Sequence, residues 1–200
     1  DVYKRQLQRA YDRWRPRIEQ LVGHVMGHPL ELGPYRGIGP EGLRVGPSRF
    51  RAGKEDDSTL STRGIQVRLH PLASWRQRGL VLDLDAVDPV VDLRRNAQGQ
   101  LWVLGRLKPG GEPPRIDLRI RVVRPAPLRI WNVTPQGRPL AFQFQGGAQL
   151  RFQERSIRFQ AGVSAPGEAG VARVEGEGNW RRNLWRVDLA TRDFAAAPFE

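Results

Sequence analysis

Apolar residues recur at steps of three and four over the first 28 residues, and this period predicts an amphipathic helix. The apolar positions are Leu7, Ala10, Tyr11, Trp14, Ile18, Leu21, Val22 and Val25. Arginines fill the other side of this helix. Pro16 lacks an amide donor, so we expect a kink there or two shorter helices. Gly27 and Pro29 end the helical pattern.

A basic amphipathic helix is typical of two arrangements. It can lie in a membrane interface, with Tyr11, Trp14, Ile18 and Leu21 as its membrane-proximal residues. Alternatively, the apolar stripe covers the hydrophobic end of the sheet that follows. The sequence leaves both arrangements open.

After Pro29, apolar and polar residues alternate, which predicts β-strands to the end of the chain. The alternating apolar positions are Ile65, Val67 and Leu69; Leu80, Leu82 and Leu84; Ile116, Leu118, Ile120 and Val122; Leu140, Phe142 and Phe144; Leu150 and Phe152; Ile157, Phe159 and Ala161; and Trp185, Val187 and Leu189. Charged and amide residues lie between them, so each strand has one apolar and one polar face.

Turn-forming residues separate these strands and predict an antiparallel meander. They lie at residues 135–137, at Gly146 with Gly147, and at Gly167. The cluster at residues 96–99 predicts a hairpin whose second strand contains Trp102 and Leu104. The charged loop at residues 52–62 is the clearest polar insertion, and we expect it to be mobile.

The strand spacing suits a sandwich, a barrel or an open sheet. No second set of strands is recognisable as a cover for the apolar face, which favours the open form. We therefore expect a mainly β protein: an N-terminal amphipathic helix, residues 1–28, and an open, curved, U-shaped sheet with an apolar inner face, residues 29–200. Asp1 to Gln6 look like an adaptor-derived end, and we expect the sheet to be truncated at its C-terminal end.

The 200 residues carry a net charge of +12, and arginine supplies nearly all of the positive charge. Such a balance suits an anionic lipid headgroup, a nucleic acid or an acidic partner. The chain has no cysteine, so disulfides, a thiol nucleophile and a cysteine metal site are excluded. No apolar run approaches the roughly 18 residues that a spanning helix needs.

Motifs that could support catalysis are isolated. Residues 37–42 match G-x-G-x-x-G, but no parallel strand precedes them and no helix follows, so they predict a turn between two strands. His24 and His28 share a helical spacing and lack a third metal ligand. Asp83 and Asp85 alternate with leucines, as on the solvated face of a strand. We expect no enzyme activity, no metal and no cofactor.

Residues 30–50 read Leu-Glu-Leu-Gly-Pro-Tyr-Arg-Gly-Ile-Gly-Pro-Glu-Gly-Leu-Arg-Val-Gly-Pro-Ser-Arg-Phe. This segment resembles the first β-hairpin after the membrane anchor in cyanobacterial TamB proteins. Residues 88–93 and 96–102 resemble a later strand and hairpin of the same family, and the likeness covers residues 20–104. The loop after Ser48 departs from the family, because it is charged here and rich in proline and threonine there.

The resemblance implies a segment of a long periplasmic protein that is related to the AsmA-like group and to bridge-like lipid transfer proteins. Such a protein moves lipids, or assembles outer-membrane proteins, between the inner and outer membranes of the cell envelope. The implied ligand is a phospholipid or glycolipid. The implied partners are the inner membrane, through an anchor, and an outer-membrane barrel assembly protein, both contacted by parts that this chain lacks.

Alternation with polar residues also selects the side chains that we expect to line a lipid groove. These are Ile116, Leu118, Ile120, Val122, Phe142, Phe144, Phe152, Ile157 and Phe159. The alternative is that they form a closed core. Two other functions stay open: a scaffold or chaperone module for outer-membrane proteins that pairs through a sheet edge, and a basic oligonucleotide-binding barrel. We expect no nucleic-acid partner.

Overall fold

The computed structural model describes residues 2–102, 115–166, 170–179, 181–182 and 184–192. The helices are α1 (Val2–Met26) and α2 (Pro71–Gln77). The strands are β1 (Leu30–Glu31), β2 (Tyr35–Gly39), β3 (Gly42–Val45), β4 (Ser48–Phe50), β5 (Thr59–Thr62), β6 (Gly64–Leu69), β7 (Leu80–Val87), β8 (Val90–Arg94), β9 (Ile116–Trp131), β10 (Leu140–Arg151), β11 (Ser156–Ser164), β12 (Val171–Asn179) and β13 (Leu184–Arg192).

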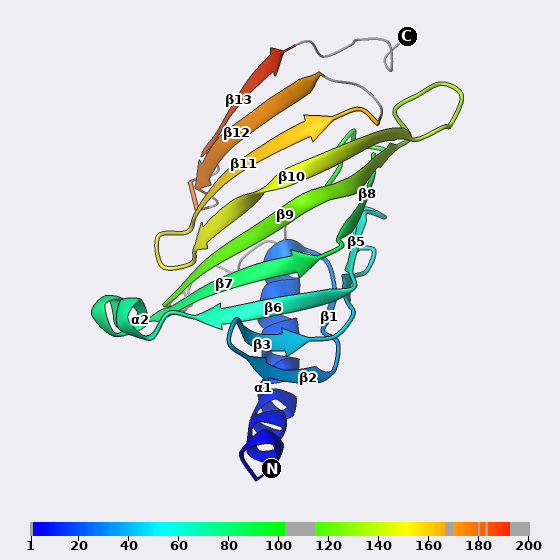
Figure 1. The fold of residues 1–200 in the computed structure, drawn as a ribbon. Helices are drawn as coiled ribbons and strands as arrows, with labels where there is room; N and C mark the ends of the chain where they lie inside the picture. Colours follow the sequence, from blue (N-terminus) through cyan, green and yellow to red (C-terminus); the bar gives the residue numbers. More distant parts are fainter. Residues whose placement is uncertain (1, 103–114, 167–169, 180, 183, 193–200) are drawn as a thin grey trace.

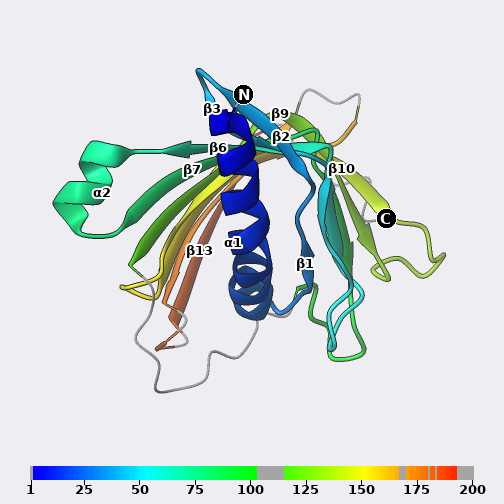
Figure 2. The ribbon, with the colours of Figure 1, turned by 90° about the horizontal axis from the view of Figure 1, so that it is seen from below.

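All these strands join one open, strongly curved sheet (Figure 1). Seen from below, the sheet forms an arch, and α1 lies inside it (Figure 2). The predicted fold class is confirmed: a mainly β protein with an N-terminal helix and an open, curled sheet.

The bend of the sheet follows a line of strand interruptions. β1 and β2 are separated at Pro34, β3 and β4 at Pro47, and β7 and β8 at Pro89. Proline has no amide hydrogen for a ladder bond, so each proline ends the pairing at its position. One limb of the arch then has the order β1-β4-β5-β8 and the other β2-β3-β6-β7, and both limbs pair with the long strand β9.

One pairing departs from the predicted antiparallel order. β9 pairs parallel with both β7 and β8, whereas β9 to β13 form antiparallel neighbours. A parallel neighbour requires a crossover, and Trp102 on this connection lies against the end of α1, where its indole donates a 3.0 Å hydrogen bond to the Met26 carbonyl. Trp102 is therefore not in the hairpin strand that we predicted. Leu104 lies outside the described residues.

The helix α1 runs through Pro16 without a break, so the prediction of two shorter helices is wrong. It is fixed to the strand edge by polar contacts. Tyr11 donates a 2.6 Å hydrogen bond to the Gly33 carbonyl, and Glu19 accepts one of 2.7 Å from the Leu32 amide. Among the described residues, no helix is both long enough and apolar enough to cross a bilayer.

Three further expectations are corrected. Residues 71–77 form α2, although the alternation predicted only strands after Pro29. Gly146 and Gly147 lie inside β10 and not in a turn. The charged loop is tied down at Asp56 and Ser58, which are buried, and its last residues form β5.

Candidate functional site

The concave side of the sheet carries an unbroken apolar row. Residues that face one another across nine strands are Ile38, Leu43, Val67, Leu84, Ile120, Ala148, Phe159, Gly176 and Val187. Side chains alternate between the two faces of a strand, so this register puts the whole row on one face. Tyr35 belongs to the same face, and its ring lies 6.2 Å from Tyr11 of α1, so this is the face that α1 occupies. We call it the inner face.

The opposite, outer face is charged. The neighbouring positions on the strands β7 to β13 carry aspartates, arginines, glutamines and glutamates. Arg121 donates to Asp85 at 2.7 Å, and this hydrogen bond raises the pKa of Arg121 above its usual value. Arg158 lies 3.7 Å from Glu177. Over the strands β7 to β13, the curved sheet therefore has an apolar side and a side on which charged and amide residues predominate.

The nine predicted groove residues all lie on the inner face, but they differ in exposure. Leu118, Phe142 and Phe152 are buried, and Leu118 and Phe152 form a core cluster with Leu150. The other predicted residues are half-buried: Ile116, Ile120, Val122, Phe144, Ile157 and Phe159. Part of the predicted set thus packs as a core, and part is accessible from the concave side.

The inner-face apolar side chains of β13 are exposed, and the sequence pattern selected no groove residue there. Trp185, Val187 and Leu189 share the inner face and are 45%, 57% and 66% exposed. Their alternation was visible in the sequence. What it could not show is that no described strand lies beyond β13, which leaves these side chains exposed.

Two glycines on β12 shape the inner face. A Cβ atom at Gly176 would lie 2.3 Å from the Phe159 ring, and one at Gly178 would lie 2.3 Å from the Trp185 ring. Both aromatic rings therefore lie over glycine backbone, which only a residue without a side chain permits. As a result, large apolar rings lie across β12 instead of projecting from it.

The predicted membrane-proximal residues of α1 divide in the same way. Tyr11 is 8% exposed because it packs against β2, and burial raises the pKa of its hydroxyl above the ordinary value. Trp14, Ile18 and Leu21 are 54%, 41% and 37% exposed. The helix thus uses Tyr11 to bind the sheet and keeps an accessible apolar stripe.

A buried histidine joins α1 to the loop that follows β4. His28 is 0% exposed. Its Nδ1 lies 3.0 Å from the Arg51 carbonyl oxygen, and its Nε2 lies 3.2 Å from Oδ2 of Asp56. Its ring lies against the Trp102 ring, with the ring centroids 3.9 Å apart and the ring planes tilted by 35°. We call His28, Asp56 and Trp102 the His28 cluster; it holds three distant segments together.

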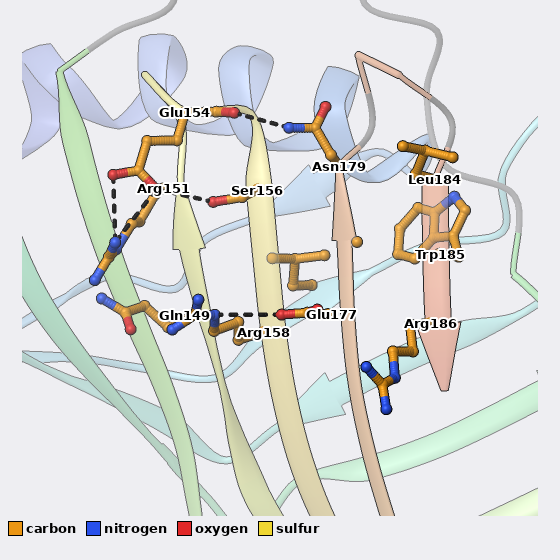
Figure 3. Close-up of a pocket in the computed structure, with 12 residues that line it drawn as sticks. Gln149, Arg151, Glu154, Ser156, Arg158, Glu177, Asn179, Leu184, Trp185 and Arg186 are labelled. Carbon is orange, nitrogen blue, oxygen red and sulfur yellow. Dashed lines mark hydrogen bonds and ion pairs between the residues drawn. The ribbon is translucent and has the colours of Figure 1, made fainter. Parts of the chain in front are cut away.

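A polar pocket of about 310 Å³ lies at one end of β10 to β13 (Figure 3). Its charged groups satisfy one another: Arg151 lies 3.2 Å from Glu154, Glu154 accepts from Ser156, and Asn179 donates to the Glu154 carbonyl. None of the protein's histidines lines this pocket, so Ser156 has no imidazole base there. The pocket has the composition of an ion-paired surface hollow.

The isolated motifs have structural roles. Residues 37–42 belong to the β2–β3 hairpin: Gly42 has a positive φ angle directly after the turn, and Gly37 has one at the register shift inside β2. Asp83, expected on a solvated face, is 7% exposed, and its carboxylate lies 2.9 Å from His70. Within the described parts of the chain, no three histidine or acidic side chains are placed to hold a metal ion.

The fold therefore defines a class: an open, curved sheet with an apolar concave face and a helix seated inside it. Comparisons of the chain with protein-family models, with curated proteins and with solved structures found no match.

Proposed function

We propose that the inner face shields the acyl chains of a phospholipid or glycolipid, as part of a TamB-like envelope protein that transfers lipid between the inner and outer membranes. The observation that carries the proposal is the apolar row from Ile38 to Val187, which crosses nine strands without a charged side chain. No catalytic step and no cofactor belong to this function.

The energetics of a lipid in water explain why such a surface is useful. Exposing a methylene costs about 0.8 kcal/mol, so a chain of sixteen methylenes costs on the order of 13 kcal/mol. A continuous apolar face lowers that cost at every point along the path. A sheet with one apolar and one charged face provides this surface and keeps its other side hydrated.

The test compares two single substitutions on the same exposed strand. Val187→Asp places a carboxylate on the inner face, and Ala190→Asp places the same charge on the outer face. Both positions are exposed, so neither change disturbs the core. Native mass spectrometry in detergent-free buffer, followed by lipid extraction and a fluorescent-lipid titration, measures bound lipid.

We expect the wild type and Ala190→Asp to carry lipid equally. Val187→Asp should bind lipid at least about tenfold more weakly, because a bound acyl chain would bury the unpaired carboxylate. A wild type that is free of lipid and cannot be loaded would contradict the proposal. Equal binding by the two variants would contradict the assignment of the inner face.

A second candidate is a scaffold that binds unfolded outer-membrane strands. It is favoured by β13, which among the described strands pairs only with β12 and contains no proline to block a further strand. A synthetic strand from an outer-membrane barrel protein should then crosslink along β13, with no lipid taken up.

A further inference from the structure

The helix α2 carries the two most exposed large apolar side chains among the described residues. Leu72 is 76% exposed and Trp75 is 79% exposed. They are three positions apart, so they share one side of the helix. Figure 1 shows α2 projecting beyond the ends of β6 and β7, away from the arch and from α1.

Hydrogen bonds at Ser74 hold α2 in this projecting position. The Ser74 hydroxyl accepts a 3.0 Å hydrogen bond from the Val81 amide on β7, and the Gly79 amide donates to the Ser74 carbonyl at 3.1 Å. Arg78 has the left-handed conformation that ends the helix. Ser74 thus faces the sheet while Leu72 and Trp75 face away from it, so the exposure of the apolar pair is fixed by the fold.

The surroundings of the apolar pair are basic. Arg76 and Arg78 follow Trp75, and the exposed Arg115 lies beside them because its carbonyl accepts the Leu80 amide at 2.7 Å. None of these arginines forms an ion pair with a described carboxylate, whereas Arg68 and Arg121 on the neighbouring strands both lie near Asp85. Residues 71–82 contain no acidic side chain.

We propose that α2 is a membrane-surface contact, which inserts Leu72 and Trp75 among the headgroups of an anionic bilayer while its arginines bind lipid phosphates. Tryptophan suits this position because its ring is apolar and its indole N–H is polar. Arginines beside the inserted residues add attraction to anionic lipid. The contact does not require that the inner face hold lipid.

The experiment measures flotation of the full chain with vesicles of neutral phosphatidylcholine, alone or mixed with anionic phosphatidylglycerol. We expect binding to the anionic vesicles that falls at least about tenfold in Trp75→Ser, given the apolar area removed from water. Val123→Ser is the matched control, because Val123 is 61% exposed on β9 and far from α2 along the sheet. Arg76→Gln combined with Arg78→Gln should remove the preference for anionic lipid.

A site-specific probe separates this contact from lipid uptake by the inner face. The chain has no cysteine, so Leu72→Cys takes a single polarity-sensitive dye, with Val123→Cys as its control. We expect a blue shift on vesicle addition at position 72 alone, and the same shift when Val187→Asp is also present. Absence of vesicle binding, an unshifted dye at position 72, or full binding by Trp75→Ser would each overturn the proposal.

Discussion

Replacing His28 by alanine tests whether the His28 cluster holds α1 to the sheet. The substitution removes a fully buried ring, its contacts to the Arg51 carbonyl and to Asp56, and its contact with the Trp102 ring. Leaving a buried polar partner unsatisfied costs about 1–3 kcal/mol, and truncating a buried side chain adds the cost of the cavity that it leaves. Asp56 keeps the 2.8 Å hydrogen bond from the Ser58 amide, so we expect a total of about 3 kcal/mol.

Urea unfolding followed by tryptophan fluorescence measures this free energy. In a thermal melt, about 3 kcal/mol should lower the midpoint by about 6–12 °C for a chain of this size. His24→Ala is the control, because His24 lies one helical turn earlier and is exposed; it should change the stability by less than about 0.5 kcal/mol. If His28→Ala unfolds within about 1 kcal/mol of the wild type, the cluster does not hold α1 in place.

Two further substitutions test the packing of the sheet and of α1. A Cβ atom at Gly146 would lie 2.1 Å from the Gln160 carbonyl oxygen, so Gly146→Ala should lower the unfolding free energy by at least about 2 kcal/mol. Gly162→Ala meets nothing closer than 3.7 Å and should be tolerated; equal effects in urea unfolding would refute the close approach. Tyr11→Phe removes the hydrogen bond to Gly33 and should cost about 1–2 kcal/mol at neutral pH. Burial raises the pKa of Tyr11 above 10.0, so the wild type should lose stability as the pH rises through that raised pKa, and Tyr11→Phe should not show this loss; parallel pH profiles would contradict it.

The alternation of residue types was enough to predict the strands and the apolar face, because burial on one side imposes a period of two. Leu118, Ile120 and Phe159 were placed correctly on one face for this reason. The partners of each strand were not predictable. Nothing in residues 80–94 indicates that they pair parallel with β9, because local alternation does not determine which strands become neighbours.

The errors share a physical cause, which is contact between segments far apart in sequence. Gly146 resembles a turn residue, but its lack of a side chain permits the close approach of Gln160 within the sheet. Asp56 resembles a residue of a mobile loop, but His28 pairs with it across 28 positions. The local sequence pattern predicts neither of these two contacts. The short helix α2 was missed because seven residues are too few to show a helical period.

The two edges of the sheet differ in how their backbone groups are satisfied. At the β1–β2 edge, α1 satisfies two backbone groups: Glu19 accepts from the Leu32 amide, and Tyr11 donates to the Gly33 carbonyl. A strand that added at this point would need those groups. Because α1 already occupies them, the helix protects this part of the edge from further pairing, whereas β13, at the other edge, pairs with β12 alone among the described strands. The β13 edge is therefore where we expect a further strand to add, as the scaffold function would require.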